Sequence, residues 1–319
     1  TVAILAQVPP FPRPLSSFAA RARARSLAFV GAMSEQPAES YEGFELIKVS
    51  VADGVGHLRL ANLASKNAVS IKLRREVSAC LSALSADPAV RAVILSAEGK
   101  VFSAGIDITE LGMLGSEGQS LDPGRRAVVI ADFIRGFQDF VTAFERCQKP
   151  ILAAVHGPCI GAGIDIITAC DIRLCAQQAI FSVREAKVGL AADVGTLQRL
   201  PKVVGCDSWI RDLAFTGRDF GAEEALRHGL VQEVLASPEA LLERATALAR
   251  QIAANSPLAV AATKASLNYS RDHSVAEGLE HILLVNQVNL QAPDTMVAAQ
   301  AFLTKKSPSF PDLPRPSKL

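Results

Sequence analysis

The sequence lacks the features that define several large functional classes. None of its apolar runs is long enough to cross a bilayer as a helix. Its 33 basic and 32 acidic side chains nearly cancel, which argues against a surface built for nucleic acid or for a charged membrane. No phosphate-binding loop occurs, and Gly161-Ala162-Gly163 does not extend to a dinucleotide-binding fingerprint, because position 166 is Ile. The five histidines are scattered, so no metal site is predicted.

The cysteines form no recognisable framework either. Their spacing matches neither a set of zinc ligands nor the disulfide pattern of a small secreted domain. Most of them lie inside apolar segments, which predicts reduced thiols in the core of an intracellular protein. The six are Cys80, Cys147, Cys159, Cys170, Cys175 and Cys206.

What the sequence does contain is a turn of small residues between a predicted strand and a predicted helix. The apolar run Ile151–Val155 is typical of a buried strand. It leads into His156–Gly163, and a helical pattern follows over Ile164–Cys170. The first N–H groups of a helix have no partner inside it, so the turn predicts a site for an anion or a developing oxyanion.

Three carboxylates lie in or close to this stretch. Asp165 stands between two isoleucines in the helix, Glu185 follows the alternating run Ile180–Val183, and Asp193 lies among small residues. Acids in apolar surroundings have raised pKa values, which suit proton transfer near neutral pH. Alternatively, Asp165 caps a helix or pairs with a buried Arg, and the other two lie on solvated loops. Three acids beside a donor-rich turn favour a site.

A second turn of the same kind occurs earlier in the chain. The predicted strand Ala92–Ser96 ends in the small-residue segment Gly99–Asp107, before a short helical stretch at Ile108–Leu111. The two turns could each present one N–H group to the same carbonyl oxygen. Such a pair forms an oxyanion hole, in which one donor contributes roughly 2.7–4 kcal/mol to lowering the barrier. Two ordinary strand-to-helix turns are the alternative.

The order of predicted elements indicates the fold class. Phe44–Val51 and Val55–Leu60 alternate as in a hairpin around Asp53-Gly54, and the helix Ile71–Leu84 follows. A strand–strand–helix unit recurs through the central stretch. We therefore predict an α/β fold, a spiral of ββα units rather than a doubly wound sheet.

Further helices are predicted at 125–147, 196–204, 207–216, 222–228, 238–254, 258–269 and 274–291. The first carries an apolar stripe that is typical of core packing: Val129, Phe133, Phe137, Phe140 and Phe144. The polar, Gly-rich segment Gly112–Gly124 before it predicts a loop at the edge of a substrate entrance.

These patterns divide the chain into an N-terminal segment, a core, a helical region expected to mediate oligomerisation and a tail, at 1–43, 44–237, 238–304 and 305–319. The first segment has four arginines and no acid before Glu35, which suits a mitochondrial transit peptide or a disordered tail. The tail ends in Ser317-Lys318-Leu319, an address read by the peroxisomal import receptor. We therefore expect the peroxisome, with the mitochondrion as a second compartment.

Three motifs together resemble the crotonase (enoyl-CoA hydratase/isomerase) superfamily. They are Ser103–Asp107, His156–Asp171 and Gly189–Pro201, and the resemblance spans roughly Phe44 to Thr304. The run Val188–Pro201 is most similar to the dienoyl-CoA isomerases of that superfamily. The resemblance implies a crotonase-like ββα spiral with a helical C-terminal appendage.

The resemblance also implies residue roles. An acyl-CoA thioester oxygen would be held by the backbone N–H groups of Ile106 and Ala162, beside Gly105 and Gly161. The superfamily usually has Gly at the position of Ala162; a backbone donor survives that change, although a methyl group now lies near the oxygen.

Glu185 and Asp193 would form the acid/base pair and Asp165 the supporting carboxyl. The implied reaction converts 3,5-dienoyl-CoA to 2,4-dienoyl-CoA in fatty-acid β-oxidation. Asp193 would take the C2 proton and Glu185 would serve C6, although the sequence alone does not fix this direction.

The resemblance implies no cofactor, since coenzyme A is part of the substrate. Coenzyme A is expected to contact Lys66, Asn67 and Ala68. The resemblance further implies homotrimers, usually paired into hexamers, and no membrane partner.

Two other functions stay open at this point. Hydratases of the superfamily typically have Glu in place of Asp165 and Gly in place of Asp193, so both positions favour the isomerase. Some relatives bind RNA, and the candidate patch would be Lys72, Arg74 and Arg75 with Lys66 nearby. A solvated helix face or contact with the CoA phosphates explains those charges more simply. An inactive structural subunit is disfavoured by the intact set of acids.

Overall fold

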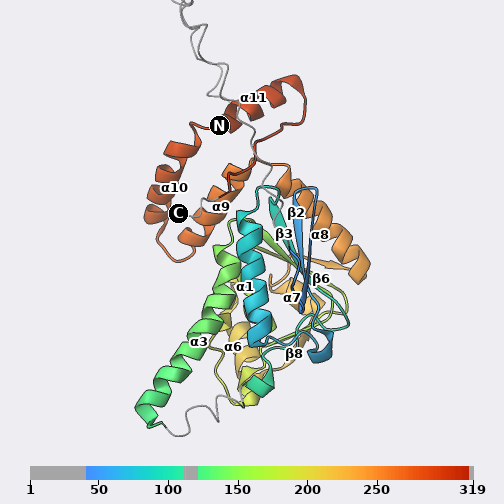
Figure 1. Ribbon diagram of the computed structural model, residues 1–319, viewed down its shortest axis with the longest axis vertical. Coiled ribbons are helices and arrows are strands. Elements are labelled where there is room, and N and C mark those ends of the chain that lie inside the picture. Colours follow the sequence, from blue (N-terminus) through green and yellow to red (C-terminus); the bar gives the residue numbers. More distant parts are fainter. Residues whose placement is uncertain (1–40, 111, 113–120, 316–319) are drawn as a thin grey trace, which may run out of the picture. The chain divides into compact units, whose positions relative to one another are not determined.

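The computed structural model describes residues 41–110, 112 and 121–315 (Figure 1). The predicted N-terminal address, the C-terminal Ser317-Lys318-Leu319 and most of the loop predicted at 112–124 lie outside the described residues.

A six-stranded sheet forms the centre of the described fold. Its order is β1-β2-β3-β4-β6-β9, and only β1 runs antiparallel to its neighbour. The predicted hairpin is confirmed: Asp53 and Gly54 both have positive φ, as a two-residue hairpin turn requires. The strands are β1 (Ile47–Ala52), β2 (Val55–Leu60), β3 (Ala92–Ala97), β4 (Ile151–Val155), β6 (Ile172–Ala176) and β9 (Glu233–Leu235).

Alternate residues of the central strands enter two separate cores. In β4, Ile151, Ala153 and Val155 pack with the side chains of α1 (Ile71–Ala86), α3 (Pro123–Arg146) and α4 (Ala162–Ala169). Leu152 and Ala154 face the other way, toward α8 (Pro238–Ala253). Figure 1 shows α1 and α3 on one side of the strands and α8 on the other. A strand buried on both faces has no polar alternation, which explains its continuous apolar run.

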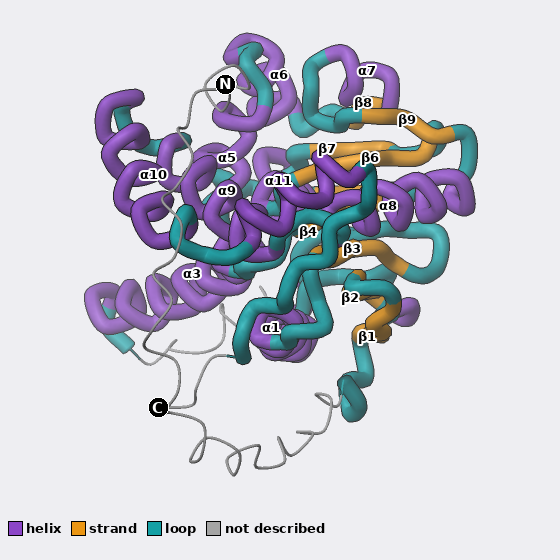
Figure 2. The backbone as a smooth tube through the Cα atoms, turned by 90° about the horizontal axis from the view of Figure 1, so that it is seen from above, coloured by secondary structure: helices purple, strands orange, loops and turns teal. Residues whose placement is uncertain are grey.

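A second sheet of three short strands, β5-β7-β8, completes the repeat (Figure 2). Strand β4 leads into β5 and β6 leads into β7, so successive turns of the chain supply one strand to each sheet. Ser103, after β3, bridges to Cys159 of β5 in the same manner. The predicted spiral of ββα units is confirmed. The short strands are β5 (Pro158–Ile160), β7 (Ile180–Ser182) and β8 (Asp219–Gly221). Strand β5 was not predicted, because Pro158 and its neighbours have the composition of a turn.

Most predicted helices agree with the structure within two residues. Helix α3 begins earlier than predicted, because the Asp122 side chain accepts the N–H groups of Gly124 and Arg125 and caps the helix at Pro123. The segment predicted as a loop through Gly124 therefore ends sooner. The other elements are η2 (Leu63–Ser65), η3 (Glu185–Val188), α5 (Thr196–Val203), α6 (Asp207–Thr216), α7 (Ala222–Arg227), α9 (Pro257–Ser270), α10 (Val275–Asn289) and α11 (Asp294–Thr304).

The C-terminal helices do not all form one appendage. Helix α8 covers a face of the large sheet with Leu241, Ala245 and Ala249, so it belongs with the core although the predicted division placed it beyond residue 237. Helix α9 is attached through buried Lys264, whose ammonium donates to the Asp171 carboxylate at 2.8 Å. Of the C-terminal helices that the structure describes, α9, α10 and α11 extend away from the sheet (Figure 1). Among the described residues, no helix has the length and apolar composition needed to span a bilayer.

Candidate active site

The two small-residue turns lie against one another. The N–H of Ile160 donates to the carbonyl of Ser103 at 3.0 Å. Gly105 has φ +94°, and a Cβ placed on it would lie 3.1 Å from the carbonyl oxygen of Ile160 and 3.8 Å from the nitrogen of Ala162. Gly161 has φ +51°, and its Cβ would lie 3.9 Å from the Cα of Gly105. Glycine at both positions permits this backbone conformation and this close approach.

One amide from each turn has no acceptor among the residues that the structure describes. Val69 donates to the carbonyl of Gly105 and accepts from the N–H of Asp107, which leaves the intervening N–H of Ile106 outside that bridge. Ala162 is the first residue of α4, where an N–H group has no partner within the helix. Neither amide donates a hydrogen bond to a residue that the structure describes. Two such donors suit an oxyanion.

Both residues line a cavity of about 500 Å³ that is otherwise largely apolar. The three predicted acids, Asp165, Glu185 and Asp193, line the same cavity, as do Gly105 and Gly161. Its apolar side chains include Ile106, Ile108, Ile130, Phe133, Ile134, Phe137, Val188, Leu190 and Val194. This volume and lining suit a hydrocarbon chain with a polar group at one end.

Asp165 is completely buried. One carboxylate oxygen accepts the N–H of Thr196, the first residue of α5, at 2.5 Å, and the other has no hydrogen-bond partner in the part of the chain that the structure describes. Burial raises the pKa of this carboxyl to about 6; Asp193 adds to the rise, whereas Thr196 and Arg199 oppose it. Asp165 therefore accepts the first N–H group of α5, as the capping role considered in the sequence analysis requires. It also lines the cavity, and its second oxygen makes no hydrogen bond to a described residue.

Glu185 is half-buried at the start of η3. Its Oε1 atom lies 3.2 Å from the position of a Cβ on Gly161, and its Oε2 atom is buried without a partner. Burial, together with the charges of Asp165 and Asp193, raises the pKa of this carboxyl to about 7. Asp193, in contrast to the expected apolar setting, is exposed, and its backbone carbonyl accepts the Gln138 side chain at 2.7 Å.

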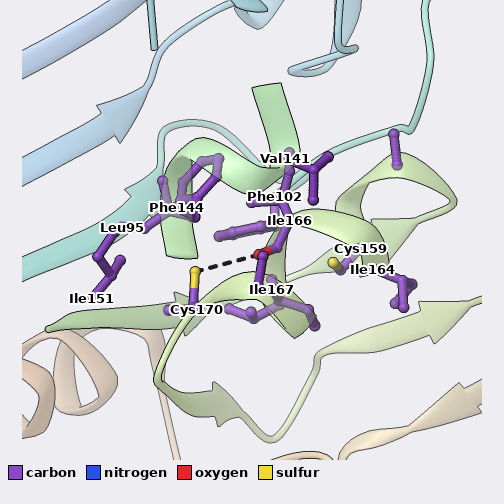
Figure 3. Close-up of a cluster of buried hydrophobic side chains, with 14 of the residues drawn as sticks. Leu95, Phe102, Val141, Phe144, Ile151, Cys159, Ile164, Ile166, Ile167 and Cys170 are labelled. Atoms are coloured by element: carbon purple, nitrogen blue, oxygen red, sulfur yellow. Dashed lines mark hydrogen bonds between the residues drawn. The ribbon is translucent and has the colours of Figure 1, made fainter. Parts of the chain in front are cut away.

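The helix that carries Ala162 and Asp165 is fixed by its own burial. Every residue of α4 is buried. Figure 3 shows Ile164, Ile166 and Ile167 of this helix among core side chains that include Phe102 and Phe144. A helix held in this way cannot shift without disturbing the core, so the amide and the carboxyl keep a fixed relation.

The three residues predicted to contact coenzyme A are not brought together at the cavity. Lys66 is exposed and lines it. Asn67 is buried, and its side-chain amide donates to the carbonyls of Glu98 and Val101 at 3.0 and 2.8 Å. Ala68 is buried as well. Asn67 and Ala68 thus support the turn that carries Ile106 rather than offering side chains to a ligand.

The candidate RNA patch is interrupted by one buried residue: Lys66, Lys72 and Arg75 are exposed, whereas Arg74 is not. Arg74 is buried, lies over the rings of Phe133 and Phe137 and pairs with Glu110. Lys72 pairs with the exposed carboxylate of Glu45.

Two side chains of the cavity wall differ from the sequence prediction. The apolar stripe that includes Phe133 and Phe137 predicts core packing, yet both side chains line the cavity, because one helical stripe can serve both surfaces.

Within the described ranges, no three His, Cys, Asp or Glu side chains are grouped so as to hold a metal ion.

Comparison with known proteins identifies the family of the chain. The enoyl-CoA hydratase/isomerase family profile matches residues 50–313. The human "Delta(3,5)-Delta(2,4)-dienoyl-CoA isomerase, mitochondrial" is 45% identical over 275 residues, 86% of this chain and 83% of the human protein. The Arabidopsis thaliana "Delta(3,5)-Delta(2,4)-dienoyl-CoA isomerase, peroxisomal" is 40% identical over 276 residues, 86% of this chain and 99% of the plant protein.

Among solved structures, a putative enoyl-CoA hydratase from Streptomyces coelicolor A3(2) superposes with a TM-score of 0.76 at 30% identity, covering 89% of this chain and 98% of that one. The chain belongs to the enoyl-CoA hydratase/isomerase (crotonase) family.

Proposed function

We propose that the chain is a dienoyl-CoA isomerase that converts 3,5-dienoyl-CoA to 2,4-dienoyl-CoA. One observation carries the proposal: three carboxyls and two free backbone amides line a single apolar cavity. Proton removal and proton delivery at two points of one acyl chain need two acid–base groups, and the intermediate enolate needs an oxyanion site. Relatives with this activity in their names are 40–45% identical over most of the chain.

The reaction begins when the C2–H bond breaks. The proton passes to a carboxylate, and the electron pair moves toward the thioester oxygen. The amides of Ile106 and Ala162 donate to that oxygen and lower the energy of the extended enolate. The electrons then return through the conjugated chain, a proton is added at C6, and the double bonds come to lie at positions 2 and 4.

The proposed roles of the acids follow from their surroundings. Glu185 has a pKa of about 7, so near neutral pH a substantial fraction of it carries the proton needed at C6. Asp193 is the exposed acid and accepts the proton from C2. Asp165 keeps one free oxygen in the cavity and supports the pair through its charge. These two proton transfers are redox-neutral, so we propose that no cofactor takes part.

The first test is an ultraviolet assay in which the purified chain receives 3,5-dienoyl-CoA or 2-enoyl-CoA. Absorbance of the conjugated 2,4-dienoyl product is expected to rise with the first substrate. Rapid hydration of the second without isomerisation of the first would contradict the isomerase and favour a hydratase.

The second test replaces the proposed base. Asp193→Asn is nearly isosteric and should lower turnover by about 10³-fold or more while acyl-CoA still binds. The matched control is Asp139→Asn, an exposed acid on α3 outside the cavity lining. Near-normal turnover of Asp193→Asn would exclude the assigned role.

We also propose that the chain forms homotrimers or hexamers. Helices α9–α11 expose many large apolar side chains, which is unfavourable in water and typical of a surface that packs against another subunit. They include Leu267, Val275, Leu279, Leu284, Val288, Leu290, Met296, Phe302 and Leu303. Light scattering after size exclusion should give three or six times the monomer mass; a monomer would contradict this.

For the cellular address, we propose the peroxisome first and the mitochondrion second. The human relative is named mitochondrial and the Arabidopsis relative peroxisomal. Deleting Ser317-Lys318-Leu319 should leave the purified enzyme active and abolish its peroxisomal import in cells. Unchanged import would contradict the address.

A further inference from the structure

A buried ion pair behind the cavity takes no part in the proposed chemistry. Arg74 lies on α1 with its side chain 10% exposed, and the Glu110 side chain is 11% exposed. Their nearest charged atoms, Arg74 Nη2 and Glu110 Oε2, are 3.5 Å apart. Burying a charge is costly unless a partner compensates it, so each of these side chains depends on the other to remain where it is.

Glu110 belongs to the segment that carries one of the two oxyanion donors. It follows Ile106 by four residues. Both Ile106 and Ile108, which lies between Ile106 and Glu110 in the sequence, line the cavity. Its Oε1 atom accepts the N–H of Ile71, the first residue of α1, at 2.5 Å. The carboxylate therefore holds the Ile106 segment against the amino end of α1, where a negative charge is favoured.

Arg74, which does not itself line the cavity, lies over two aromatic rings that do. Its guanidinium carbon lies 4.1 Å from the ring centroid of Phe137 and 5.3 Å from that of Phe133. Both distances allow cation–π attraction. Phe133 and Phe137 lie on α3 and line the cavity. One side chain thus links α1, the aromatic wall on α3 and, through Glu110, the Ile106 segment.

We propose that Arg74 and Glu110 are positioning residues that set the spacing between the Ile106 amide and the aromatic wall, and so determine which acyl chain lengths the enzyme prefers. The inference rests on the proposed function, because it concerns the acyl chain of that substrate. Both residues act through others: the amide is placed by Glu110 and the rings by Arg74. The planar guanidinium can stack on two rings while it pairs with a carboxylate, which an ammonium group does less well.

The test compares a long-chain with a short-chain 3,5-dienoyl-CoA, offered together. The quantity measured is kcat/KM for the long chain divided by kcat/KM for the short chain. This ratio does not depend on how much of the enzyme is folded, so a purely structural defect leaves it unchanged. In Arg74→Met and Glu110→Gln we expect this ratio to fall at least about fivefold, because a loosened wall loses contacts that only the longer chain makes. The ratio of Arg74→Lys should lie between that of the wild type and that of Arg74→Met.

The matched control is Arg218→Met, which breaks an ion pair with Glu224 outside the cavity lining. Its ratio should equal that of the wild type. Wild-type ratios in both Arg74→Met and Glu110→Gln would overturn the positioning role. A wild-type chain that isomerises neither substrate would instead refute the proposed function, so the two failures are distinguishable.

Discussion

Replacing Glu185 with Gln should inactivate the enzyme and yet make the folded protein more stable at alkaline pH. The change keeps the size and shape of the side chain and removes its negative charge. In the wild type, Glu185 must ionise in a site where burial and the neighbouring acids, Asp165 and Asp193, oppose ionisation. Gln avoids that cost.

The pKa of Glu185 indicates the size of the effect. Burial and the nearby charges raise it from 4.5 to about 7 in the folded protein. Each pH unit of difference corresponds to about 1.36 kcal/mol, which gives an upper limit of roughly 3 kcal/mol. The side chain is only half-buried, and solvent screening reduces the value to about 2 kcal/mol.

The sign follows from proton binding. Below pH 4.5 both the folded and unfolded wild type carry the proton, and the two proteins should be equally stable. Between pH 4.5 and 7 the unfolded wild type releases the proton while the folded one retains it, so wild-type stability declines relative to the variant. Above pH 7 the difference reaches its full value.

Denaturant unfolding at equal protein concentration, repeated from pH 4.5 to 8.5, measures this difference. Glu243→Gln, an exposed carboxyl on α8, is the control for removing one negative charge. A difference that stays constant with pH, or a variant that is less stable at pH 8, would refute the reasoning. In the same series, wild-type kcat/KM should decline above pH 7, as Glu185 loses the proton it delivers.

Three further substitutions test other contacts. Gly105→Ala should lower kcat about 10²-fold in the isomerase assay, because its Cβ would lie 3.1 Å from a backbone oxygen and displace the neighbouring oxyanion amide. Lys264→Met should lower the free energy of unfolding by about 3 kcal/mol, because it leaves the Asp171 carboxylate without its 2.8 Å partner; calorimetry checks this. Asn67→Ala should cost about 2 kcal/mol in denaturant unfolding, because two backbone carbonyls lose their donors.

The fold was predictable where local chemistry decides the conformation. Asp53-Gly54 adopts the positive φ values that a two-residue hairpin needs, and the strand Ile151–Val155 is apolar because helices cover both faces of its sheet. The family motifs located the acids and both glycines of the turns. These features depend on residues close together in the sequence or on a pattern that repeats.

Other parts of the site depend on which distant segments meet. Arg74 has the sequence setting of a solvated helical Arg, and only the approach of α3 and of Glu110 buries it. Phe133 and Phe137 belong to one apolar stripe, and the sequence does not say which of its members face a cavity. The side chain of Asn67 donates to carbonyls that lie far along the chain. Composition and periodicity carry no information about such partners.

The roles that we propose for the three acids agree with the contacts that hold each residue in place. Asp193 is fixed through its backbone, since Gln138 donates to its carbonyl and the nearby N–H of Thr196 is held by Asp165. Its carboxylate itself is exposed to solvent. Glu185 keeps Oε2 without a hydrogen-bond partner among the described residues. Asp165 accepts the N–H of Thr196 with its carboxylate, which fits the supporting role that we propose for it, with proton transfer assigned to Glu185 and Asp193.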